Sequence, residues 1–191
     1  MSPQPNRPQI GATNGIGFTV ALFVRDRFGL QSGAAVPRLA PRVEPIPIPG
    51  NVETIDATAW DRWWTELTHM PAGRTSRPTT SPGLAVLFDE ILDQARIWES
   101  DVVPAVPYMP AWGPEMLWRN RDRLAGRGPV KHDTEFVPVE GRWHRILSPN
   151  RLLVSVETWL DHDLMDLLLR PQMTALIEGP ENSGPCHIGD M

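Results

Sequence analysis

Cysteine, tyrosine and lysine each occur only once in this chain of 191 residues, and each shortage excludes something. The single Cys186 cannot form a disulfide within the chain, which argues against a disulfide-stapled secreted domain. Long hydrophobic runs are also missing. The longest, residues 16–24, is shorter than the roughly 20 residues that cross a bilayer. The charged residues 25–27 follow it where a signal peptide would carry small ones. We therefore predict a cytoplasmic protein with no membrane segment.

Basic charge comes almost entirely from arginine, because all but one of the 18 lysines and arginines are arginine. The arginines are scattered and the formal net charge is -5, which is unfavourable for a phosphate-rich partner. We interpret the arginine bias as the codon usage of a GC-rich bacterial or phage genome. The basic stretch from Arg119 to Lys131 is interpreted as a solvated face, and we do not expect a nucleic-acid partner.

Hydrophobic periodicity predicts an α+β fold. Residues 16–24 are rich in β-formers with apolar side chains on both faces, which is typical of a covered strand. Residues 134–158 contain three β-rich runs separated by turn residues, which predicts a meander. Helices are predicted over 57–70 and 81–100, after Gly113-Pro114, and from Asp161 onward. We expect a small antiparallel or mixed sheet, made of strand 16–24 and meander 134–158, packed against three to four helices.

The domain organisation follows from the same patterns. We expect one domain over residues 16–178, with a flexible N-terminal tail at 1–15 and a flexible C-terminal tail at 179–191. The chain has 21 prolines, and several fall in residues 36–50, which cannot form a helix. This segment is a structural connector or, alternatively, a polyproline docking arm.

One glycine pattern imitates a cofactor site. The segment GATNGIGF, with Gly11, Gly15 and Gly17, resembles the glycine-rich cofactor turn of short-chain dehydrogenases. That turn requires a strand before the glycines and a helix after them. Here the preceding residues are proline-rich and the following ones favour a strand. The family's Tyr-x-x-x-Lys pair is absent too, since Trp112 stands four residues after Tyr108. We predict a plain turn and no cofactor.

Histidines and carboxylates crowd together near the meander. His132, Asp133 and Glu135 are close in sequence, and His144 follows in the next predicted strand. Catalysis or metal binding would need such groups to converge on one point. The sequence contains no His-x-x-x-His helix pair and no cysteine knuckle, so we predict no metal site. These four residues are weak candidates for a catalytic or ligand-binding site.

Tryptophan is the most unusual feature, with eight residues against one tyrosine. Trp60, Trp63 and Trp64 fall on one predicted helix, and tryptophan is enriched at interaction hot spots. The three are candidate binding residues for a protein partner or for a stacked ligand, and packing in the core is the alternative. We expect Trp60 and Trp64 to be buried and Trp63 to be exposed as a binding residue. Our first hypothesis is a non-catalytic bacterial or phage protein that binds another protein or itself, within an assembly. The alternative is a small enzyme or ligand-binding protein with its site at the four histidine and carboxylate residues.

Overall fold

A four-stranded mixed sheet forms the centre of the fold. The computed structural model describes residues 9–50, 52, 55–56, 58–79, 81–103, 119, 121–124 and 131–178. The strands lie in the order β1-β2-β4-β3. β1, β2 and β4 run parallel, and β3 is antiparallel to β4. The predicted α+β class is confirmed. The strands are β1 (Gln9–Asn14), β2 (Lys131–Val137), β3 (His144–Ser148) and β4 (Arg151–Ser155).

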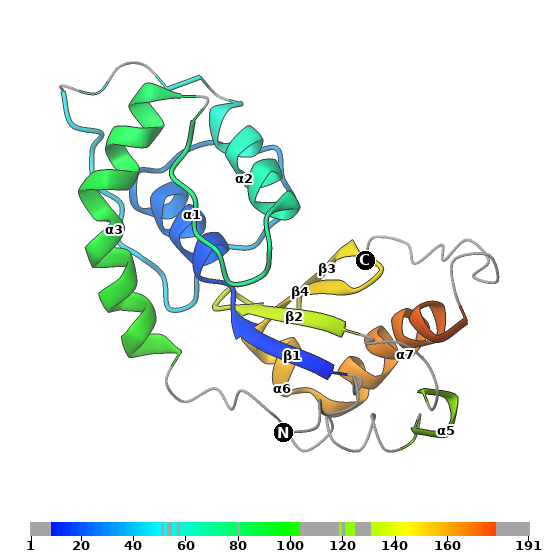
Figure 1. Ribbon diagram of the computed structural model, residues 1–191. Coiled ribbons are helices and arrows are strands. Elements are labelled where there is room, and N and C mark those ends of the chain that lie inside the picture. Colours follow the sequence, from blue (N-terminus) through cyan, green and yellow to red (C-terminus); the bar gives the residue numbers. More distant parts are fainter. Residues whose placement is uncertain are drawn as a thin grey trace, which may run out of the picture.

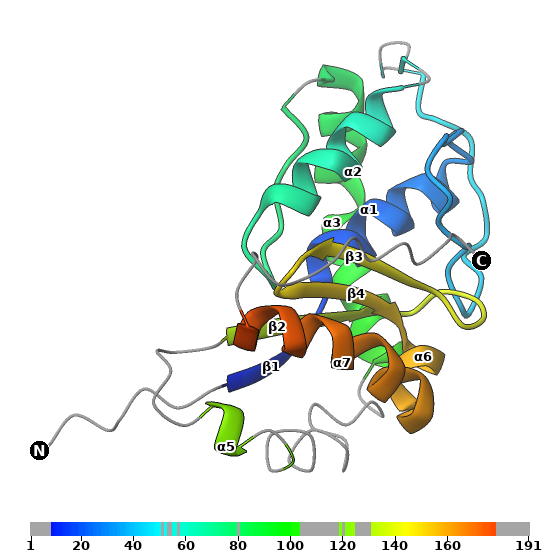
Figure 2. The ribbon, with the colours of Figure 1, turned by 90° about the vertical axis from the view of Figure 1, so that its right-hand side faces the viewer.

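Helices cover both faces of this sheet, giving three layers (Figures 1 and 2). One face carries α1 (Ile16–Arg27), α2 (Ala59–His69) and α3 (Pro82–Val102). The opposite face carries α6 (Val156–Leu160) and α7 (His162–Glu178). Each face buries its own apolar cluster, so the sheet separates two cores.

The strand predicted over residues 16–24 is wrong, because this segment forms helix α1. Every residue from Gly17 to Asp26 is buried, since α2, α3 and the sheet surround the helix. A helix that is buried all round carries no 3.6-residue apolar stripe, so periodicity could not distinguish it from a covered strand. Gly17 permits the close packing: a Cβ there would lie 2.2 Å from the carbonyl oxygen of Arg74.

Residues 9–14, expected within the flexible N-terminal tail, instead form strand β1. They pair in parallel with β2 from Gln9–Lys131 to Asn14–Phe136. The strand is held by main-chain hydrogen bonds rather than by an apolar pattern, which explains why its small and polar residues did not predict it. The other predicted tail, 179–191, lies outside the described residues.

The predicted meander is wrong in its connections, although its strands exist. β3 and β4 form the expected hairpin, but β2 pairs in parallel with β4, so β2 and β3 are not neighbours. Pro138 lacks an N–H for strand pairing, which would favour an edge position for β2. β2 ends at Val137, before this proline, and is therefore paired on both sides. The expected last strand turns into α6 at Val156, where the Ser155 side chain accepts from the Thr158 N–H.

The remaining helices agree with their sequence signals. The Ser81 side chain accepts from the Leu84 N–H at the start of α3, and Asp161 accepts from the Leu164 N–H at the start of α7. α3 packs mainly on α1, and it also contacts the sheet where Glu99 accepts from Asn14 of β1. The helix predicted after Gly113-Pro114 lies mostly outside the described residues, which include only the short α5 (Arg121–Leu124) there. Among the described helices, none combines the length and apolar content needed to cross a membrane.

Candidate functional site

The four predicted histidine and carboxylate residues do not share one site. Side chains alternate along β2, so His132 points toward α7 while Glu135 points toward α1 and α2. Their hydrogen bonds agree with these directions: His132 contacts Gln172 of α7, and Glu135 contacts Arg151 and the loop after α2. Asp133 pairs with Lys131 at 2.9 Å. His144 lies two strands away, on β3.

His132 is fully buried beneath α7. Its Nε2 lies 2.9 Å from Oε1 of Gln172, whose Nε2 donates to the carbonyl of Leu168. Burial lowers the pKa of His132, so the ring is neutral at neutral pH. These contacts join β2 to α7. His132 therefore has a structural role in the core between the sheet and α7.

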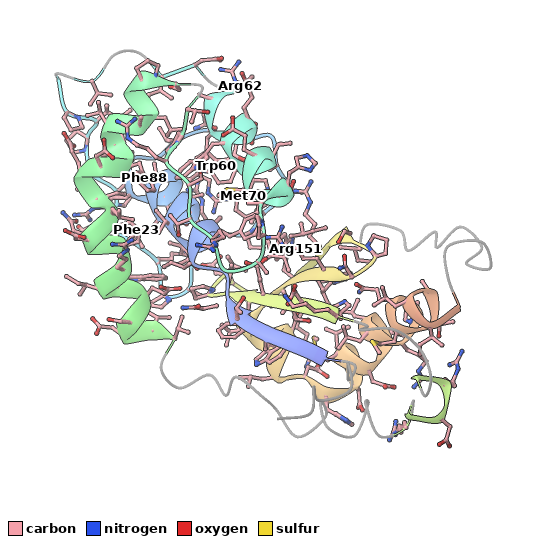
Figure 3. The ribbon with its side chains drawn as sticks, viewed as in Figure 1. Phe23, Trp60, Arg62, Met70, Phe88 and Arg151 are labelled. Carbon is pink, nitrogen blue, oxygen red and sulfur yellow. The ribbon has the colours of Figure 1, made fainter. Side chains whose placement is uncertain are left out.

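Glu135 belongs to a buried ion pair with Arg151. Nε of Arg151 lies 2.7 Å from Oε1 of Glu135. The same guanidinium donates to the carbonyls of Thr68 and Met70 at the end of α2, and the Gly73 N–H donates to Glu135 Oε2 at 2.8 Å. Figure 3 shows Arg151 reaching from the sheet toward Met70. The network provides hydrogen-bond donors for main-chain carbonyls at the end of α2, and it attaches this end of the helix to the sheet.

The tryptophan prediction is wrong for Trp63, which is 0% exposed. The segment after α2 folds back over the helix, and the Trp63 Nε1–H donates to the carbonyl of Ser76 at 3.0 Å. Trp60 and Trp64 are also buried and stack with ring centroids 5.1 Å apart. Trp60 donates to the Ala21 carbonyl at 2.7 Å. The three tryptophans therefore form core, and none offers an exposed binding patch.

A pocket of about 630 Å³ lies where β3 meets α2 and the loop after α1. The loop is held against α2 by Asp61, whose carboxylate accepts from the Ser32 hydroxyl and from the N–H groups of Gly33 and Ala34. The pocket is in the size range of ligand sites. Its lining residues are Gly33, Ala34, Ala35, Asp61, Trp64, Thr65, Arg142, Trp143, His144 and Arg145.

The pocket borders the open edge of the sheet. Trp143 accepts from the Ser155 N–H at 2.8 Å, and the Trp143 N–H donates to Ser155 Oγ at 3.1 Å, so both main-chain groups of Trp143 face β4. Main-chain direction alternates along an antiparallel strand. Arg145 therefore faces β4 as well, whereas the N–H and C=O of His144 and Ile146 face away. Within the described residues, no segment pairs with this outer side of β3.

Positive charge is concentrated at this edge. Arg142 pairs with Asp161 at 2.9 Å while remaining largely exposed. The Arg145 side chain shares the sheet face of Leu153, and therefore of α2, because the two residues are register partners. Burial lowers the pKa of His144, so its ring stays neutral and the two arginines carry the charge. The Asp61 carboxylate already accepts hydrogen bonds from the loop after α1, so it is only partly available to pair with Arg142 or Arg145.

Sequence reasoning reached two residues of this pocket, His144 and Trp64. Arg145, Trp143 and Asp61 were missed. The signal that could have found them is the run Arg142-Trp143-His144-Arg145, in which cationic and aromatic residues crowd into a short strand. The position of the edge itself depends on β4 lying between β2 and β3, which no local pattern specifies.

A second missed residue is Glu99 near the end of α3. It is 6% exposed, and its Oε1 accepts from Nδ2 of Asn14 at 3.1 Å, at the carboxyl end of β1. Burial raises the pKa of Glu99 to about 7. Its neighbourhood continues into residues that the structure does not describe, so we treat it as a titrating group and not as a site.

No group of three or more histidine, cysteine, aspartate or glutamate side chains suited to a metal ion occurs among the described residues. The expectation that no strand precedes these glycines and that a strand follows them is wrong, because the glycine-rich segment joins strand β1 to helix α1, as its resemblance requires. However, Gly17 faces the Arg74 carbonyl.

Comparison with family models, curated proteins and solved structures found no match.

Proposed function

We propose that this chain binds another protein by accepting an extended segment along the outer edge of β3. The observation that carries the proposal is the edge at His144 and Ile146, with which no described segment pairs and which lies directly beside a formed pocket. A sheet edge presents main-chain donors and acceptors to an incoming strand, and adjacent pockets provide side-chain selectivity. Trp60 and Trp63 are buried, do not line the pocket and take no part in this binding.

Side-chain exposure supports the same surface. Ile146 is 41% exposed in the middle of β3, although its register partner Leu152 is fully buried. An added strand would bury Ile146 on the face that α6 and α7 cover. β1 is the other edge strand, but the side chains of its first two residues are not described.

The features of β3 also limit what can pair with it. The strand has five residues, a register irregularity between Ile146 and Ser148, and the charged Arg145. Short, irregular and charged edges prevent indiscriminate strand pairing. They leave a short recognition length, so the partner needs matching side chains as well as free main-chain groups.

Substitution of Ile146 by proline tests the proposal. The Ile146 N–H faces away from β4, so Ile146→Pro removes the outer donor while keeping the inner ladder, a position where proline is tolerated. Ile146→Val is the matched control, because it keeps the N–H and a β-branched side chain. The two variants and the original chain are used as baits in quantitative capture from cells of the source organism, after circular dichroism shows equal folding.

A partner retained by the original chain and by Ile146→Val, but lost with Ile146→Pro, supports binding at this edge. Equal capture by all three baits, or no specific capture by any, overturns the proposal. A partner that is captured equally shows that another surface binds it.

A second candidate function is small-ligand binding in the pocket itself. Trp64 lines the pocket, and its buried indole N–H has no acceptor among the described residues. A buried donor without an acceptor is unfavourable, and a bound carboxylate could satisfy it. Titration with benzoate, followed by tryptophan fluorescence, tests this function. Saturable binding that Trp64→Phe weakens supports it, and no binding at millimolar benzoate contradicts it.

A further inference from the structure

We infer that the segment accepted by β3 carries an acidic residue opposite Arg145, flanked by apolar residues opposite His144 and Ile146. The inference rests on the proposed function, because it specifies what binds at that edge. It follows from the direction of the main-chain and side-chain groups along three consecutive residues.

Main-chain geometry sets the register. The outward N–H and C=O groups belong to His144 and Ile146, so an antiparallel partner forms its hydrogen-bonded pairs with these two residues. The partner residue between them then lies opposite Arg145 in a non-hydrogen-bonded pair. In such pairs the Cα atoms are only about 4.5 Å apart, and their side chains interact closely.

Side-chain direction sets the chemistry at the central position. Arg145 shares the face of Leu153 and borders the pocket with Arg142. No ion pair of Arg145 occurs within the described residues. A residue opposite Arg145 points to this same face. Aspartate or glutamate there meets a guanidinium that can donate two hydrogen bonds, whereas lysine meets like charge.

The flanking positions face the other side of the sheet. Ile146 projects there, 41% exposed, beside buried Leu152. An apolar residue opposite Ile146 would cover this side chain and extend the apolar surface above α6 and α7. The His144 side chain projects to the same face as its register partner Val154, which is buried in the apolar cluster on the α7 side, so this position also suits an apolar neighbour. A second copy that presented its own β3 in this register would place Arg145 opposite Arg145, and this like-charge pair is unfavourable, so the acidic segment belongs to a different protein.

Two synthetic peptides test the charge requirement directly. The probes are Ac-Gly-Ser-Val-Glu-Val-Ser-Gly-NH2 and the same peptide with lysine in place of glutamate, each carrying a fluorescent label. Binding to the full chain is measured by fluorescence anisotropy at low ionic strength. Cross-strand charge pairs change affinity by about two- to fivefold. The glutamate peptide should therefore bind about two- to fivefold more tightly than the lysine peptide.

The charge-reversed variant Arg145→Glu should invert this preference, and Arg123→Glu is the control, because it alters an exposed arginine on α5. Inversion by Arg145→Glu alone supports the inference. Equal binding of both peptides, with loss of both in Ile146→Pro, overturns the charge requirement but leaves edge pairing intact. Binding that Ile146→Pro does not affect overturns both proposals. Concentration-dependent self-association that Ile146→Pro abolishes identifies a second copy as the occupant and overturns the inference.

Discussion

The buried pair of Glu135 and Arg151 provides a sharp test of how the helical layer is attached to the sheet. The Glu135 side chain is 1% exposed and that of Arg151 is 11% exposed. Glu135→Gln keeps the shape but removes the charge, leaving a buried guanidinium without its counter-ion. Breaking a buried pair from one side costs about 3–5 kcal/mol of unfolding free energy. We therefore expect a loss of that size.

The double variant Glu135→Leu/Arg151→Met removes both charges. It therefore separates the cost of an unpaired buried charge from the cost of losing the whole pair. Replacing both charges by apolar groups is often close to neutral. Here the carbonyls of Thr68 and Met70 also lose their donor, which costs about 1–3 kcal/mol for each unsatisfied group. The Gly73 N–H loses its acceptor as well. The double variant should therefore cost at least as much unfolding free energy as Glu135→Gln, although no unpaired charge remains buried.

Guanidinium chloride unfolding, followed by tryptophan fluorescence, measures these differences. The matched control is Glu140→Gln, which breaks the exposed pair with Arg42 at 2.6 Å and should leave the midpoint nearly unchanged. A loss below about 1 kcal/mol for Glu135→Gln would refute the reasoning. A double variant that is markedly more stable than Glu135→Gln would refute it too.

Three further predictions concern buried groups. The pKa of Glu99, raised from 4.5 to about 7, means that the folded chain holds a proton that the unfolded chain loses. Stability should therefore fall as pH rises through this window, and Glu99→Gln should remove the decline in urea titrations at pH 5, 6, 7 and 8. The pH dependence due to His132 has the opposite sign. Because burial lowers the pKa of His132, the free energy of unfolding should fall as pH drops below about 6.5. His132→Gln should flatten that slope, and an unchanged slope contradicts the burial account. Trp63→Ala should cost about 3–5 kcal/mol in chemical unfolding because the side chain is fully buried; a cost below about 1 kcal/mol would show that Trp63 is not core.

Strong local signals predicted their elements well, and weak ones failed for identifiable reasons. Ser81 and Pro82 specify the start of α3 through a cap and a fixed φ, which act within one turn. Residues 16–24 have no such signal, because a helix enclosed on all sides is apolar all round. β1 is supported by pairing with β2, more than a hundred residues away in sequence. No local pattern encodes a partner at that separation.

The candidate site was less predictable than the fold. His132, Asp133 and Glu135 are adjacent in sequence, but strand alternation sends them to opposite faces of β2. Trp63 was expected to be exposed because α2 was considered alone, without the segment that covers it. The binding edge at β3 depends on strand order, which is a tertiary property.

Residue-resolved hydrogen exchange by NMR tests the central proposal most directly. The amides of His144 and Ile146 face outward, whereas the Arg145 amide already faces β4 and is an internal control. Exchange is measured in the free chain and in the presence of the glutamate peptide or a captured partner. We predict strong new protection at His144 and Ile146, with little change at Arg145. A saturated complex in which the His144 and Ile146 amides exchange as fast as in the free chain would contradict the account.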